Sequence, residues 1–177
     1  MTKLPAAQPA NDDDANALEL WPAAGPDGVP SLGEVGLDHF APYLLNRISN
    51  GWNASLASAL NRFDISTTKM RTLAVLSVSP GITIKELSVL AVTEQSTLSR
   101  SLDGLEQQGL IRRRPKAEDA RVREVFITDT GQAVFAELWP VMFTMYARLF
   151  RGVDPAEFRA FLGTAHKILR NIQGSDA

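Results

Sequence analysis

From residue 38 onward, hydrophobic positions recur every three or four residues over long stretches, and this spacing predicts amphipathic helices. The first stretch covers residues 38–63 and predicts one long helix. A second helix is expected from Ser66 or Thr67, either of which is a suitable N-cap, to Val78, where a Pro-Gly pair follows. The apolar stripe of the long helix consists of Leu45, Ile48, Trp52, Leu56, Ala59 and Phe63.

Two further helical patterns follow, separated by a short gap. Thr83 and Glu86 have the spacing of a capping box, which predicts a third, short helix ending near Leu90. A fourth helix starts near Glu94, with leucines on one stripe and polar residues on the other. Two helices joined by a tight turn, the second with a polar outer face, form a helix-turn-helix. The leucines are Leu98, Leu102 and Leu105, and the polar residues are Ser96, Ser99, Arg100, Asp103 and Gln107.

A basic β-hairpin is predicted directly after the fourth helix. Gly109 is typical of the left-handed residue that ends a helix, and Leu110 begins a strand that Pro115 ends. Residues 116–120 form a charged loop, after which β-favouring residues resume over 122–128.

The last part of the chain predicts two more helices with broad apolar faces. Thr128 can cap one that runs to about Arg151, and Asp154 with Pro155 begins the other. Burial of a large apolar side chain stabilises by about 1.5 to 3 kcal/mol, so a partner surface is expected to cover these faces. The apolar positions are Phe135, Leu138, Trp139, Met142, Met145, Tyr146, Leu149 and Phe150, then Phe158, Phe161, Leu162, Ala165, Ile168, Leu169 and Ile172.

Positive charge is concentrated around the hairpin, although the whole chain has a net charge of −2. Residues 100–123 contain seven Lys or Arg against four Asp or Glu, a local charge of +3, and the remainder carries −5. Such an excess suits contact with a polyanion, and the alternative is a solvated hairpin that is basic by chance. A helix that enters the major groove beside an arginine in the minor groove would fit duplex DNA.

Composition argues against several other classes of protein. The chain contains no cysteine, which excludes disulfides, thiolate nucleophiles and cysteine zinc sites. His39 and His166 are the only histidines, and the common hydrolase, phosphate-loop and zinc-protease motifs are missing, so we expect no enzyme activity, cofactor or metal. Without an apolar run of about 18 residues or a signal-like start, a cytoplasmic location and no membrane contact are expected. Residues 1–36 hold five of the ten prolines and little periodicity, which predicts an extended or disordered arm.

Two segments resemble the MarR family of winged helix-turn-helix regulators. QSTLSRSLDGLEQQGLIRRR is similar to the family's recognition helix and first wing strand, and EDARVREVFITDTG to its acidic-x-Arg wing, second strand and Thr-x-x-Gly entry into the next helix. The resemblance covers roughly residues 38 to 172. One departure is Asp64-Ile65-Ser66, where the family usually has Gly-Leu-Thr.

The resemblance implies a mainly α fold, a winged helix-turn-helix with a small β-hairpin wing and with N- and C-terminal dimerisation helices. Residues 64–131 would form the DNA-binding domain, and residues 37–63 with 132–173 the helical dimerisation region. A two-fold dimer would place two recognition helices about one DNA turn apart, which suits a near-palindromic site.

The residues expected to contact DNA come from the fourth helix and the wing. Arg121 occupies the wing-tip position where the family carries an arginine for the minor groove, and Asp119 could orient it by a charge-assisted contact. Arg113 is expected among the distributed phosphate contacts. The DNA-binding candidates are Gln95, Ser96, Thr97, Ser99, Arg100, Arg112, Arg114, Lys116, Arg121 and Arg123.

A ligand cleft is also expected, since members of the resembled family often bind aromatic acids or phenols. Arg47 or His39 would bind the carboxylate of such a ligand. In the alternative, the candidate residues are ordinary core or interface residues, or lie on a solvent-exposed edge of a helix. The candidates are His39, Tyr43, Arg47, Asn50, Trp52, Met70, Trp139 and Met142.

The sequence thus predicts a homodimeric transcriptional regulator that binds double-stranded DNA. We expect a repressor of a near-palindromic operator that a small aromatic or phenolic ligand releases. The alternative is a winged-helix module that binds another protein and no DNA.

Overall fold

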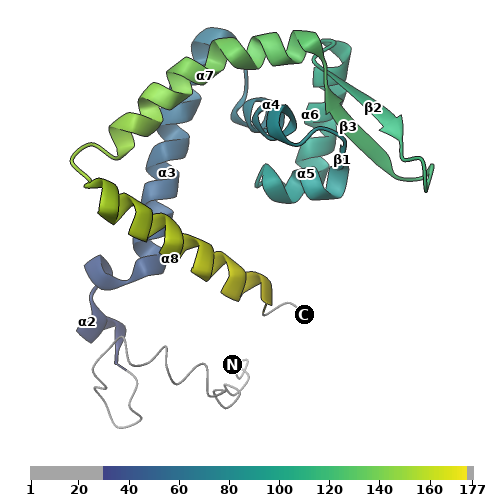
Figure 1. Cartoon of the computed structure of the whole chain (residues 1–177). Helices are drawn as coiled ribbons and strands as arrows, with labels where there is room; N and C mark the ends of the chain where they lie inside the picture. The colour runs from purple at the N-terminus through teal and green to yellow at the C-terminus, as the bar shows by residue number, and fades with distance from the viewer. Residues whose placement is uncertain (1–29, 175–177) are drawn as a thin grey trace, which may run out of the picture. The chain divides into compact units, whose positions relative to one another are not determined.

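The computed structural model describes residues 30–174. The chain divides into two compact units, residues 1–54 and residues 55–177, and the boundary falls inside the long predicted helix. Figure 1 labels the elements in chain order. Most of the predicted N-terminal arm, residues 1–29, lies outside the described residues.

The first unit contains a short helix that begins at Leu32, inside the range 1–36 that the sequence predicts as an extended or disordered arm. The Ser31 hydroxyl accepts a hydrogen bond from the Glu34 N–H (3.3 Å), and the Glu34 carboxylate accepts one from the Ser31 N–H (2.7 Å). This capping box closes one helical turn. Phe40 is extended, and the long helix therefore starts at Ala41 rather than at residue 38. The elements are α2 (Leu32–Val35), the 3₁₀ turn η1 (Leu37–His39) and most of α3 (Ala41–Leu60).

The second unit begins with the end of α3 and contains the predicted helix-turn-helix. The Ser66 hydroxyl caps α4 by accepting from the Lys69 N–H (3.2 Å), and Thr83 with Glu86 forms both halves of the predicted capping box of α5. Asp64, in the segment that departs from the family pattern, takes a left-handed conformation (φ 53°) that Asp tolerates. The elements are η2 (Asn61–Phe63), α4 (Thr67–Val78), α5 (Ile84–Leu90) and α6 (Gln95–Gln107).

A three-stranded antiparallel sheet follows from the predicted hairpin and one additional strand. β2 (Ile111–Pro115) pairs with β3 (Arg123–Ile127), which confirms the hairpin, and β1 (Ile82–Thr83) pairs with the other edge of β3. The strand order is β1-β3-β2, and the hairpin projects beyond the helices of this unit (Figure 1). β1 was not predicted because two residues carry no readable alternation.

The core of the second unit lies between α4, α5, α6 and the sheet. The three leucines predicted to face a core, Leu98, Leu102 and Leu105, are completely buried. Leu73 and Leu76 of α4 and Leu87 of α5 pack against them, together with Ile111 and Val125 of the sheet. This packing holds the polar side of α6 outward.

Two long helices complete the second unit. The Thr128 hydroxyl caps α7 (Asp129–Leu149) by accepting from the Gly131 N–H (3.1 Å), as predicted, and α7 ends two residues before Arg151. α8 (Pro155–Gly174) starts after Asp154, whose carboxylate accepts from the Ala156 N–H (2.7 Å). Among the helices of residues 30–174, none has both the length and the apolar character that crossing a membrane requires.

Candidate nucleic-acid interface

The outward side of α6 carries the polar residues predicted from sequence. Gln95, Ser96, Thr97, Ser99 and Arg100 are all exposed. Glu94, the N-cap, makes no side-chain cap hydrogen bond, so the first N–H groups of α6 are not occupied by that side chain. Free N–H groups at a helix N-terminus are suited to phosphate oxygens. The first turn of α6 therefore offers hydroxyl, amide and backbone donors together.

The tip of the hairpin is a tight turn with Arg121 at its exposed end. The Asp119 carboxylate accepts a hydrogen bond from the Arg121 N–H (2.9 Å), and the Val122 N–H donates to the Asp119 carbonyl (2.9 Å). Asp119 thus contacts the backbone of Arg121, and not its guanidinium as the charge-assisted contact predicted from the sequence requires. Among residues 30–174 the Arg121 guanidinium has no carboxylate partner, and the ion pair at the tip joins Lys116 to Glu118 (3.5 Å).

Two other arginines lie on one face of β2. The Arg112 and Arg114 guanidinium carbons lie 5.6 and 5.5 Å from the centre of the Phe126 ring on β3. Such cation–π contacts hold the side chains over the sheet while the charges remain exposed. Both arginines keep their positive charge available to a polyanion.

Arg113, which the sequence predicts as a phosphate contact, is bound to two carboxylates within the protein. Its Nε and Nη2 donate to one carboxylate oxygen of Glu106 (2.9 and 2.5 Å), and its Nη1 lies 2.9 Å from the Asp103 carboxylate. The hydrogen bonds from Arg113 are the main cause that lowers the pKa of Glu106 below its ordinary value. The same bonds to Glu106 raise the pKa of Arg113. The alternation of side chains along β2 turns Arg113 away from Arg112 and Arg114, and the sequence did not predict Glu106 as its partner.

The start of α6 and the wing share a concave surface, whose lining does not include Ser96, Thr97, Ser99 or Arg100. A hollow of about 570 Å³ is lined by Gln95 of α6, by Lys116, Arg121 and Arg123 of the wing, and by the first residues of α5. The structure therefore brings together predicted DNA-binding residues that are up to 28 positions apart in the sequence. The lining also includes Glu118 and Asp119, so the surface is mixed in sign with an excess of positive charge.

Comparison with known proteins identifies the family. The family model described as MarR family matches residues 63–122. A crystal structure of a MarR-family transcriptional regulator from Silicibacter pomeroyi is 46% identical, with a TM-score of 0.76, and the match covers 81% of this chain and 97% of that one. This chain belongs to the MarR family of transcriptional regulators.

Two more distant proteins to which this chain is similar carry descriptions of what they do. The HTH-type transcriptional repressor IacR of Pseudomonas putida is 24% identical over 144 residues, which is 81% of this chain and 86% of that protein. A structure of Bordetella bronchiseptica BpsR, described by the regulation of its DNA binding by 6-hydroxynicotinic acid, has a TM-score of 0.64. It is 20% identical and covers 72% of this chain and 97% of its own, a similarity that concerns the fold.

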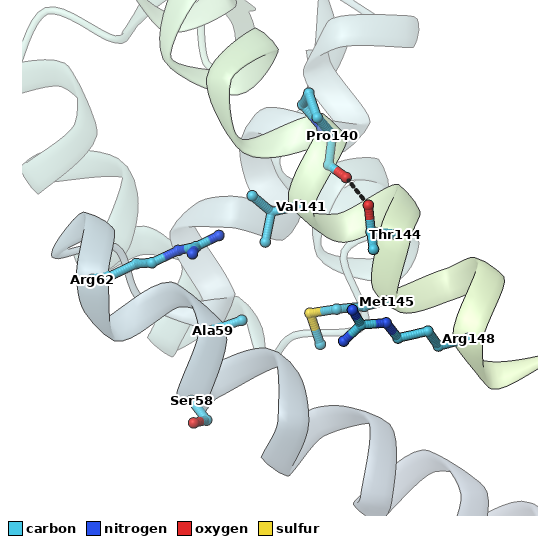
Figure 2. A pocket seen from close by; sticks show the side chains of 8 residues that line it. All are labelled: Ser58, Ala59, Arg62, Pro140, Val141, Thr144, Met145 and Arg148. Atoms are coloured by element: carbon cyan, nitrogen blue, oxygen red, sulfur yellow. Dashed lines mark hydrogen bonds between the residues drawn. The ribbon is translucent and has the colours of Figure 1, made fainter.

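A separate pocket lies between the end of α3 and the middle of α7, within the second unit of this MarR-family chain. It measures about 580 Å³ and has a mostly apolar lining (Figure 2). Arg62 and Arg148 line it, and within the described part of the chain neither forms an ion pair. The lining residues are Ser58, Ala59, Arg62, Pro140, Val141, Thr144, Met145 and Arg148.

The residues predicted to bind a ligand do not line this pocket. His39, Tyr43, Arg47, Asn50 and Trp52 belong to the first unit, where the Arg47 guanidinium carbon lies 5.7 Å from the centre of the Tyr43 ring. In the second unit Met70 is buried in the core (2% exposed), Trp139 is half-exposed and Met142 is partly buried. Arg62 and Arg148 were not predicted from the sequence, because they are 86 positions apart and no motif connects them.

Proposed function

We propose that this regulator binds a near-palindromic duplex DNA operator as a homodimer and represses transcription until a small ligand releases it. The observation that carries the proposal is the shared concave surface of α6 and the wing, with Gln95 beside Lys116, Arg121 and Arg123. A helix with short polar side chains fits the major groove, and an unpaired arginine at a wing tip fits the narrower minor groove. Arg112, Arg114 and Arg123 add exposed positive charge for phosphates.

The apolar faces of the long helices support the homodimer. Large apolar side chains of α7 and α8 are exposed in the single chain, for example Trp139 (50%), Phe143 (52%) and Ile172 (61%). In the first unit, Leu45 and Ile48 of α3 are also exposed (42% and 49%). A second copy that covers these faces would remove apolar area from water, which is the main favourable contribution to association. Two-fold symmetry then requires two similar half-sites in the DNA.

Repression and release by a ligand are supported by the relatives and by the pocket of Figure 2. IacR is a repressor, and the DNA binding of BpsR is regulated by an aromatic acid. In this chain the apolar lining with Arg62 and Arg148 suits a small aromatic or phenolic acid, whose ring would meet Val141 and Met145 and whose carboxylate would meet a guanidinium.

The test is selection of bound duplexes from genomic DNA, followed by gel-shift titration of the selected fragment. The wild-type protein is expected to enrich fragments with two related half-sites and to shift them as a complex of two copies. Arg121→Ala should weaken binding by about tenfold, the loss of one well-placed DNA contact, without changing dimerisation or thermal melting. Arg151→Ala, which removes an exposed arginine after α7, is the matched control and should bind as tightly as the wild type.

Enrichment of no DNA would contradict the proposal. It would favour the alternative of a winged-helix module that binds another protein through its apolar helices.

A further inference from the structure

Within the described part of the chain, Arg113 is the outermost residue of β2 that forms a hydrogen bond or ion pair with the recognition helix α6. Along the face of β2 that looks toward α6, Ile111 is buried (2% exposed), the Arg113 side chain is 24% exposed and Pro115 is exposed. Beyond Arg113 the strand continues outward to the tip that carries Arg121. Among residues 30–174, the hydrogen bonds and ion pairs of Arg113 are therefore the outermost ones that join the wing to α6.

The contact at this position is unusually complete. Both the Arg113 side chain and its backbone N–H bind Glu106, the latter by a 2.9 Å hydrogen bond to the second carboxylate oxygen. The remaining side of the guanidinium meets Asp103, one turn earlier on α6. The Arg113 guanidinium binds two carboxylates of α6, and the Arg113 backbone binds the same helix. Together these bonds allow little rotation of β2 relative to α6.

We infer that Arg113 is a positioning residue that holds the wing at a fixed angle to the recognition helix, so that Arg121 and α6 reach two neighbouring grooves together. It does so from within the protein and makes no contact with DNA. The inference rests on the DNA binding proposed above, and it adds that Glu106 and Asp103, although negative, favour operator binding through this contact.

If only charge mattered, neutralising Glu106 would raise the affinity for DNA, whereas a positioning role predicts a lower affinity. The two explanations can therefore be distinguished by experiment. Removal of a negative charge beside a DNA-binding surface should tighten binding to a polyanion, and it would also free the Arg113 charge for phosphates. If Glu106 instead positions the wing, its neutralisation should weaken binding to the operator. A wing at the wrong angle affects contacts that read the sequence more than it affects diffuse attraction to phosphates.

The experiment compares Glu106→Gln, Arg113→Gln and Arg113→Lys with Arg114→Gln, the matched control from the opposite face of β2. Affinity is measured for a duplex selected with the wild-type protein from a random-sequence library and for a shuffled duplex of equal length, over a series of salt concentrations. Glu106→Gln and Arg113→Gln should each lose about tenfold for the selected duplex, as for one lost base contact, and little for the shuffled one. Arg113→Lys keeps the charge but not the fork, and should lose most of the same affinity.

Arg114→Gln should behave differently, because Arg114 is placed for phosphates. It should weaken both duplexes and reduce the slope of log K against log salt by about 0.9, whereas the Glu106 and Arg113 variants keep the wild-type slope. The double variant Glu106→Gln with Arg113→Gln should lose no more than either single variant.

Unchanged or tighter binding by Glu106→Gln overturns the inference, as does a reduced salt slope for Arg113→Gln. If Arg113→Gln does not fold, which circular dichroism and melting would reveal, Glu106→Gln and Arg113→Lys decide on their own. If the wild-type protein selects no duplex, both the proposed function and the inference are contradicted. If the wild type selects a duplex and the Arg113 variants bind it with unchanged affinity, only the inference is contradicted.

Discussion

Three consecutive arginines in β2 have the same chemistry in the sequence and different environments in the fold. Arg112 and Arg114 lie over the Phe126 ring with their charges exposed, and Arg113 points to α6 and two carboxylates. The alternation of a β-strand separates them into one set for an external polyanion and one for the protein itself. A count of positive charge around the hairpin therefore overstates by one the arginines available to DNA.

The Glu106 carboxylate makes this contact dependent on pH. Its pKa is lowered from the ordinary 4.5, first by the hydrogen bonds from the Arg113 side chain and also by the nearby charge of Arg123. A carboxylate with a lowered folded-state pKa contributes stability above its unfolded pKa and loses it as the pH falls through the folded value.

We therefore expect the free energy of unfolding of the wild type to fall below about pH 4.5 by more than that of Glu106→Gln. Arg113→Gln, which removes the cause of the shift, should also lack this part of the decrease. Urea unfolding between pH 3 and pH 7 would measure it, a range that spans ordinary carboxylate pKa values. Parallel pH curves for the wild type and both variants would contradict the expectation.

At the scale of elements, the first turn of α7 is joined to the turn that ends α6. The Thr128 N–H donates to the Leu110 carbonyl (3.0 Å), and the Thr128 hydroxyl donates to the Gly109 carbonyl (2.6 Å). Gly131 lies so close that a Cβ there would be 2.0 Å from the Leu110 carbonyl oxygen. The Thr-x-x-Gly segment thus caps α7 and also packs the start of α7 closely against the turn that ends the recognition helix.

Gly131→Ala is expected to destabilise the protein by about 1 to 3 kcal/mol or more, because its methyl group would have to displace backbone. The matched control is Gly104→Ala in α6, where the nearest atoms are the end of the flexible Lys69 side chain at 3.7 Å. That substitution should be neutral or stabilise by up to about 1 kcal/mol, since alanine is the better helix former. Denaturant midpoints would compare the two variants. Equal stability of Gly131→Ala and the wild type would contradict the close packing of Gly131 against Leu110.

At the scale of the whole molecule, α7 carries both the pocket of Figure 2 and the connection to the recognition helix. Pro140 lies inside α7 and lines the pocket; it has no N–H for the helical hydrogen bond, which makes this part of the helix easier to bend. A ligand bound beside Pro140 would therefore change the bend of α7. The contact of Thr128 and Gly131 with Leu110 would transmit this change to α6.

Benzoate is a suitable probe of this site, with neutral benzamide for comparison. We expect benzoate to bind by calorimetry and to lower the affinity for the selected duplex, and benzamide to bind more weakly because it lacks the charge that Arg62 or Arg148 would meet. Arg148→Gln or Arg62→Gln should weaken benzoate binding by about tenfold, the cost of a lost charge-assisted hydrogen bond, and Arg151→Gln should leave it unchanged. If Arg47→Ala weakened benzoate binding and the Arg62 and Arg148 variants did not, the ligand would bind at the residues predicted from the sequence. That result would reject this pocket as the benzoate site.

The sequence by itself determined the features that depend on residues a few positions apart. The caps at Ser66 and Thr128, the left-handed Gly109 (φ 70°) and the buried leucines of α6 all follow from local hydrogen bonds and from helical periodicity. The family motif and the exposed polar face of α6 come from the same short-range information.

Only the tertiary structure decided which distant residues meet. It placed the two-residue β1 against β3, turned Arg113 toward Glu106, fitted Gly131 against Leu110, and brought Arg62 and Arg148 to one pocket. Each of these depends on the path of the backbone between segments, and neither charge nor periodicity along the chain specifies that path.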